Sequence, residues 1–87
     1  MTVEDSETFT HLRLRVATED DPGALARLLG YFQNLNITPR RIEAEFGTTG
    51  LTHIQIDVCG MSEARLSLIA AKITQHVPVV NAYWHRL

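Results

Sequence analysis

The stretch "EDDPGALARLLGYF", residues 19–32, decides the fold because it contains the change from a strand to a helix. Three carboxylates come first, Pro22 and Gly23 interrupt the chain, and leucines follow at helical spacing. Proline is tolerated in the first helical turn, where an N–H would have no partner, and Asp21 can cap the free amides of that turn. The sequence therefore predicts that a helix begins at Pro22.

Apolar residues of this helix form one stripe, about three turns long, at i, i+3, i+4, i+7 and i+10. They are Leu25, Leu28, Leu29, Phe32 and Leu35. We expect Asn34 and Asn36 to end the helix. Gly30 costs the helix about 0.8–1 kcal/mol relative to alanine, so we expect a neighbouring helix or the backbone of a second subunit to pack closely against it.

Alternating apolar and polar residues predict one strand before this helix and three after it. The strands are expected over residues 10–18, 41–46, 52–58 and 79–85, with "GTTG" at 47–50 closing a hairpin. In the last strand, Val80, Ala82 and Trp84 share one parity. Ser62 is a good N-cap for a second helix, whose stripe is Leu66, Ile69, Ala70, Ile73 and Val77. The order βαββαβ predicts an α+β, ferredoxin-like sandwich, a four-stranded antiparallel sheet with both helices on one face.

Length and composition predict a small cytoplasmic protein. We expect residues 1–8, which are polar and acidic, to be a disordered lead-in and residues 9–87 to form a single domain. The chain begins without the pattern of a signal peptide, its single cysteine cannot form an internal disulfide, and no apolar run approaches the ~20 residues that cross a bilayer. A net charge of −2 argues against a nucleic-acid partner.

No catalytic arrangement, metal site or cofactor is expected. The carboxylates of residues 19–21 are adjacent, so they diverge instead of converging as an acid/base pair would. Three histidines, His11, His53 and His85, share a parity on the sheet, but their spacing is not a metal-ligand motif. The outward residues of the two central strands, Arg13, Arg15, His53, Gln55 and Asp57, include no aromatic side chain on which RNA bases could stack.

Two positions could meet a small ligand. Gly23 has no Cβ, so a ligand or a second backbone can approach the loop, and the free amides of a helix start receive a carboxylate. Asn36, at the other end of the helix, offers two donors and an acceptor to a zwitterion. A helix C-cap is the alternative role of Asn36.

The segments "DDPGALARLLGYF" and "LNI" resemble the ACT domain family, a regulatory module that binds amino acids in many metabolic proteins. The resemblance covers about residues 10–86. Within that family, Pro22-Gly23-Ala24-Leu25, Gly30-Tyr31-Phe32 and Asn36-Ile37 are most similar to the short form of the small regulatory subunit of acetolactate synthase.

The resemblance implies a non-catalytic homodimer that binds a small amino-acid effector and regulates a large catalytic enzyme subunit of branched-chain amino-acid biosynthesis by allostery. In such domains the effector lies between the first loop of one copy and the helix end of the other. Carried over here, the ligand-binding positions are Asp20, Gly23 and Ala24, faced by Asn36 and Ile37. Asp20 stands where the family usually has asparagine, and its charge would repel a carboxylate. The alternative is therefore a structural or assembly subunit without a working effector site.

Overall fold

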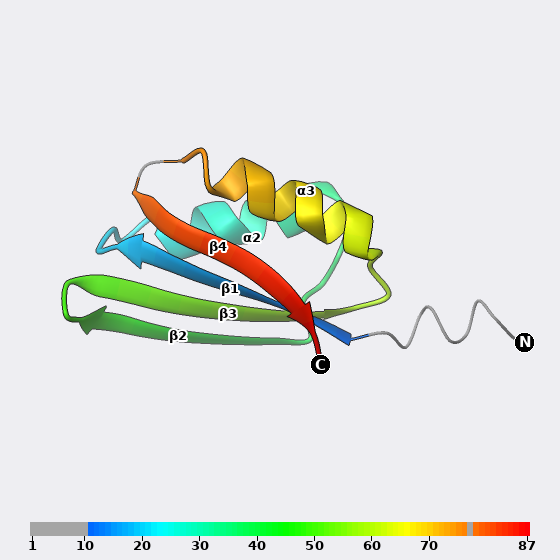
Figure 1. The fold of residues 1–87 in the computed structure, drawn as a ribbon, viewed down its shortest axis with the longest axis horizontal. Coiled ribbons are helices and arrows are strands. Elements are labelled where there is room, and N and C mark those ends of the chain that lie inside the picture. The colour runs from blue at the N-terminus through cyan, green and yellow to red at the C-terminus, as the bar shows by residue number, and fades with distance from the viewer. Residues whose placement is uncertain (1–10, 77) are drawn as a thin grey trace, which may run out of the picture.

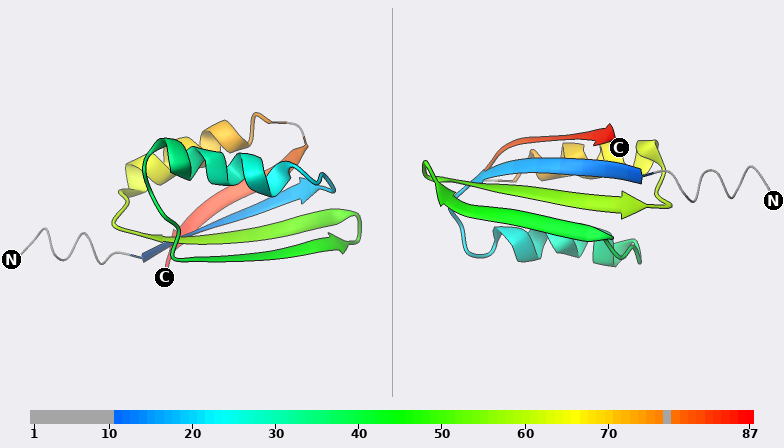
Figure 2. Two further views of the ribbon diagram at one scale, coloured as in Figure 1. Left: turned by 180° about the vertical axis from the view of Figure 1, so that it is seen from behind. Right: turned by 90° about the horizontal axis from the view of Figure 1, so that it is seen from below.

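Two helices cover one face of a four-stranded sheet in the computed structural model, which describes residues 11–76 and 78–87 (Figure 1). The elements are β1 (His11–Glu19), α2 (Ala24–Asn34), β2 (Arg41–Thr48), β3 (Leu51–Cys59), α3 (Glu63–Ile73) and β4 (Val79–Arg86). The strand order is β2-β3-β1-β4, every pairing is antiparallel, and both helices lie on the same side (Figure 2). The predicted ferredoxin-like fold is confirmed. The expected lead-in at residues 1–8, Thr10 and Val77 lie outside the described residues.

The core lies between the sheet and the helices. In β1 every second residue is buried, which confirms the predicted alternation and leaves Arg13 and Arg15 on the opposite, open face. The buried residues of this layer are Leu12, Leu14, Val16, Leu28, Phe32, Ile54, Ile56, Val58, Met61, Leu66, Ile69, Ala70 and Ile73. Burying each large apolar side chain contributes about 1.5–3 kcal/mol, so this layer holds the helices on the sheet.

The loop before α2 differs from the prediction. The helix begins at Ala24, with Gly23 as an N-cap that has no side-chain hydrogen bond. Asp21 instead accepts a hydrogen bond at Oδ1 from the N–H of Gly23 (2.9 Å), and its carbonyl accepts one from the N–H of Ala24 (3.1 Å). A helix start at Pro22 capped by Asp21 was wrong, because Asp21 stabilises the turn that precedes the helix.

The second helix begins as its sequence predicts. Ser62 is the N-cap of α3, and its Oγ accepts a hydrogen bond from the N–H of Arg65 at 3.1 Å. In the described part of the chain, neither 11-residue helix is long and apolar enough to span a membrane.

At Gly30 the described part of the chain leaves open the space that a side chain would fill. A Cβ placed there would meet nothing within 4 Å among the described residues. Close packing of a helix of the same chain against Gly30 was therefore a wrong expectation, and packing by the backbone of a second subunit stays a prediction.

The β2–β3 hairpin is tighter than predicted. Its turn is Thr49-Gly50, with φ of 57° and 81°, so both residues have the left-handed conformation of a type I′ turn. Gly47, at φ 75°, lies where the register between the strands shifts, between Glu45 and Thr48. The strands therefore continue into the "GTTG" segment that was expected to be a loop.

Exposed apolar residues line both edge strands. Val80 was predicted to share a parity with Ala82 and Trp84, which are partly buried, but it is 58% exposed because Thr18 pairs with Val79 and Ala17 with Asn81, which leaves Val80 as an extra residue in β4. On β2, Phe46 is 62% and Ile42 38% exposed. A period of two predicts which face a side chain is on, but not whether a helix covers it.

Candidate functional site

The loop between β1 and α2 presents free backbone donors. The N–H groups of Leu25 and Ala26, in the first turn of α2, have no hydrogen-bond partner among the described residues. Unpaired amides at a helix start, together with the positive end of the helix dipole, form a site that accepts an anion. Ala24 adds no free donor, because its N–H donates to the carbonyl of Asp21 and its side chain is buried.

Asp20 connects this loop to the sheet. Its carboxylate is exposed, and Oδ1 accepts a hydrogen bond from Thr52 Oγ1 at 3.0 Å. An asparagine could accept the same hydrogen bond through its side-chain oxygen. The charge of Asp20 is thus not required for the contact with Thr52, and it adds a negative group to the loop that precedes the free amides.

Arg27 is a residue of this loop that the sequence analysis did not single out. Its guanidinium pairs with Asp21, and a Cβ on Gly23 would lie 3.0 Å from Arg27 Nη1. Helical side chains lean toward the N-terminus, so a residue four positions after the N-cap covers the loop, and this spacing could have revealed Arg27. The Gly23 N–H and Arg27 together hold the pKa of the Asp21 carboxyl below its usual range. Gly23 thus makes room for a cation beside the free amides.

Asn36 and Ile37 form the other end of α2. Asn36 has a left-handed backbone (φ 59°), its N–H donates to the carbonyl of Gln33, and the N–H of Ile37 donates to the carbonyl of Phe32, both at 2.9 Å. This is a Schellman motif, which ends a helix through backbone groups alone. Because the backbone of Asn36 ends the helix and the residue is exposed, its side chain can contact a ligand while the cap is in place.

The two groups of expected site residues do not meet within one chain. Asp20, Gly23 and Ala24 lie at the start of α2, and Asn36 and Ile37 follow its end (Figure 1). An 11-residue helix is about 16 Å long. The hollow behind the first loop, which Thr18 and Arg27 help to line, has a volume of about 10 Å³, roughly the space of one water molecule. A ligand that contacts both groups needs a second copy of the chain.

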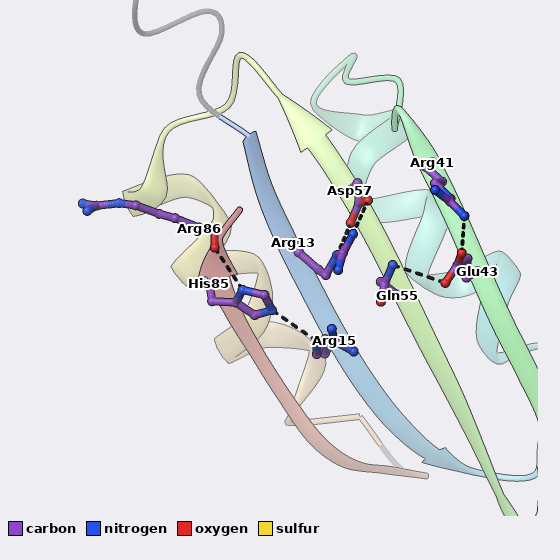
Figure 3. Close-up of polar contacts among 8 residues, drawn as sticks. All are labelled: Arg13, Arg15, Arg41, Glu43, Gln55, Asp57, His85 and Arg86. Atoms are coloured by element: carbon purple, nitrogen blue, oxygen red, sulfur yellow. Dashed lines mark hydrogen bonds and ion pairs between the residues drawn. The ribbon is translucent and has the colours of Figure 1, made fainter.

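The open face of the sheet carries a ladder of charged side chains (Figure 3). Arg13 binds Asp57 through two hydrogen bonds, Nε to Oδ1 at 2.7 Å and Nη2 to Oδ2 at 3.0 Å. Arg13 holds the pKa of the Asp57 carboxyl below its usual range. The predicted outward residues of the central strands are confirmed, and the exposed aromatic of this face, Tyr83, lies on the edge strand β4 and stacks on His85.

The three histidines of the sheet lie at different levels along the strands. His11 pairs with Cys59, His53 with Ala17 and His85 with Arg13. Among residues 11–76 and 78–87, no group of three or more histidine, cysteine or acidic side chains is placed to hold a metal ion.

Comparison with known proteins points to one family. The profile described as an ACT-like domain matches residues 4–87, nearly the whole chain. No curated protein matches the sequence.

Solved structures share the fold at low sequence identity. The C-terminal domain of the MgtC protein from Mycobacterium tuberculosis is 17% identical with a TM-score of 0.73, and the match covers 93% of this chain and 90% of that one. The ACT domain of GTP pyrophosphokinase from Chlorobium tepidum is 15% identical with a TM-score of 0.71, over 86% and 96% of the two chains. The regulatory subunit of aspartate kinase from Thermus thermophilus is 13% identical with a TM-score of 0.70, over 88% of this chain and 51% of that one.

Proposed function

The chain belongs to the ACT-like domain family, and from this premise we propose that it is a regulatory module that dimerises and binds a small amino acid between two copies. ACT-like domains are generally regulatory and not catalytic, and they bind amino acids in metabolic enzymes. The observation that carries the proposal is the division of the expected site residues between the two ends of α2.

The surface proposed for dimerisation is the β2 edge. β2 is an outer strand, Ile42 and Phe46 expose apolar side chains on it, and Gly30 leaves the outer side of α2 open to a close neighbour. A large exposed apolar group beside unpaired strand edges favours association with another chain.

Antiparallel pairing of two β2 strands would complete the ligand site. β1 and β2 run in the same direction, so the loop at residues 20–24 lies at the end of the sheet where β2 finishes. The end of α2 leads into the start of β2. A two-fold axis through paired β2 strands places the start of one strand beside the end of the other, and so brings the first loop of one copy toward the helix end of its partner.

The chemistry of the divided site suits a zwitterion. The amides of Leu25 and Ala26, with Arg27 beside them, would receive the ligand carboxylate, and the side-chain oxygen of Asn36 in the other copy would accept a hydrogen bond from its ammonium group. The negative charge of Asp20 would repel the ligand carboxylate, so we expect the natural chain to bind the amino acid weakly.

Calorimetric titration of the dimer with a panel of amino acids tests the proposal, together with sedimentation to establish the dimer. We expect Asp20→Asn to increase affinity about tenfold, because it removes a like charge and keeps the hydrogen bond to Thr52. Glu19→Gln is the matched control, since it removes the same charge one residue earlier. A strict monomer, or the absence of binding at millimolar concentration by both the natural chain and Asp20→Asn, would contradict the proposal.

A second candidate function is an assembly subunit of a metabolic enzyme without a working effector site. The observation in its favour is the exposed carboxylate of Asp20 in the loop that precedes the free amides. Binding that occurs in Asp20→Asn but not in the natural chain would support this candidate.

The narrower proposal is the regulatory subunit of acetolactate synthase, acting in the cytoplasm on branched-chain amino-acid biosynthesis. It is supported by Pro22-Gly23-Ala24-Leu25 and Asn36-Ile37. Affinity purification from native cells tests it, since recovery of an acetolactate synthase large subunit is expected and recovery of a different enzyme would replace the assignment.

A further inference from the structure

A hollow of about 590 Å³ lies on the open face of the sheet, away from the ends of α2. It forms over Ala17, whose short side chain lies between His53 on β3 and Asn81 on β4. Arg15 and Tyr83 line one side of the hollow, and Glu43 and Glu45 line the other.

Most charges on this face neutralise one another. Arg13 is paired with Asp57, and Arg41 with Glu43, whose carboxylate also accepts a hydrogen bond from Gln55 (Figure 3). These pairs neutralise the charges of Arg13, Asp57, Arg41 and Glu43.

Arg15 keeps an unneutralised positive charge. Its Nε donates to Nε2 of His85 at 3.1 Å. His85 Nδ1 lies 3.1 Å from the carbonyl oxygen of Arg86, so a proton on Nδ1 with Nε2 as acceptor satisfies both contacts, and the imidazole supplies no negative charge to Arg15 (Figure 3). The nearby carboxylate of Asp57 is already held by Arg13, which leaves the terminal guanidinium nitrogens of Arg15 available to a carboxylate.

Glu45 provides the opposite charge. It has no hydrogen-bond or ion-pair partner among the side chains that the structure describes, and it pairs across the strands with His53. The hollow thus has one unmatched cation and one unmatched anion on opposite sides. Such an arrangement favours a dipolar ligand over a purely anionic or cationic one.

The sheet register separates these two charged residues. Arg15 and Glu45 are two strand spacings apart across the sheet and two residues apart along it, which places their Cα atoms about 12 Å from each other. Arg15 is hydrogen-bonded to His85 on β4, the strand on the side of β1 away from Glu45, so its guanidinium does not turn toward Glu45. An elongated ligand with its charges at opposite ends is therefore favoured over an α-amino acid, whose ammonium and carboxylate are about 3 Å apart.

We propose that this hollow binds a small, elongated molecule with a carboxylate at one end and a primary ammonium group at the other, an ω-amino acid or an amino acid with an amine-bearing side chain. The carboxylate binds Arg15, the ammonium binds Glu45, and the methylene groups lie over Ala17 beside Tyr83, which is 51% exposed. This site is separate from the one proposed at the ends of α2 and does not depend on it.

Titration of isotope-labelled protein with 5-aminopentanoate, followed by NMR, tests the proposal. We expect saturable shifts at Ala17, His53 and Asn81, with Arg15→Gln and Glu45→Gln each weakening binding about tenfold or more. The matched controls on α3, Arg65→Gln and Glu63→Gln, should leave the affinity unchanged. Pentanoate, which lacks the ammonium, and glycine, whose charges are too close, should bind at least about tenfold more weakly.

Several results would overturn the assignment. They are shifts that do not saturate, equal affinity for glycine, and binding that both substitutions leave unchanged. Shifts confined to residues 20–24 and 36–37 would assign the probe to the ends of α2 and leave the hollow without a ligand. Concentration-dependent shifts at Ala17 and Asn81 in ligand-free protein would show that a second copy occupies the face.

Discussion

At the loop between β1 and α2, Gly23 combines an ordinary backbone conformation (φ −91°, ψ −2°) with a crowded position beside Arg27. Alanine can adopt this conformation, so we expect Gly23→Ala to change the free energy of unfolding by no more than about 1 kcal/mol. The new Cβ would displace the Arg27 guanidinium and narrow the approach to the free amides. For Gly23→Ala, thermal denaturation should therefore show little change in the melting temperature, and calorimetry should show that amino-acid binding is lost.

A large loss of stability in Gly23→Ala would contradict this reading, since it would give the glycine a structural role. Ala26→Gly serves as the comparison, because it weakens the helix by about 1 kcal/mol without adding an atom near Arg27.

Asp57 is buried (8% exposed), and the hydrogen bonds from Arg13 are the main reason that its pKa is lowered. A carboxyl whose pKa is lowered by folding stabilises the protein above its ordinary pKa, and this contribution is lost as the pH falls through the lowered value. We expect Asp57→Asn to lower the free energy of unfolding at neutral pH, because it removes the charge that pairs with Arg13. The loss should be only about 1 kcal/mol, since Arg13 is partly exposed and solvent screens the pair.

Urea denaturation at a series of pH values measures this difference. The natural chain and Asp57→Asn should converge in stability at acid pH, where the carboxyl of the natural chain is protonated. A gap that stays constant down to pH 2 would assign the effect to packing and not to charge.

At the scale of an element, the β2–β3 hairpin places a β-branched residue, Thr49, at φ 57°. The left-handed region costs a residue such as threonine about 1 kcal/mol, and asparagine before glycine is the preferred type I′ turn. We expect Thr49→Asn to raise the free energy of unfolding by about 0.5–1 kcal/mol in urea denaturation. Thr38→Asn, at a position without positive φ, is the control and should give no such gain.

At the scale of the whole molecule, the proposed dimer makes the two edges of the sheet unequal. Phe46 on β2 and Val80 on β4 are exposed to similar extents, 62% and 58%. We expect Phe46→Asp to raise the dimer dissociation constant at least about tenfold, because it places a charge in the interface, while Val80→Asp leaves it unchanged. Sedimentation over a concentration series measures both, and the opposite result would move the interface to the β4 edge.

The sequence predicts most of the fold because its signals are local. The alternation in β1 and the N-cap at Ser62 depend on residues within a few positions of one another, and both are confirmed. Other features are not local. The exposure of Val80 depends on a register shift against β1. The position of Arg27 over Gly23 depends on the residue at which the helix begins. The unmatched charges of Arg15 and Glu45 emerge only when cross-strand partners are known.

The separation of the expected site residues by the length of α2 has a consequence in the cell. On the proposed arrangement each chain carries two unlike halves of a site, so two chains must meet before one ligand can bind. Apparent affinity then rises with the amount of protein made, and a cell could adjust its response to a fixed metabolite level by changing expression of this chain alone. The chain's own abundance becomes part of the signal that it reads.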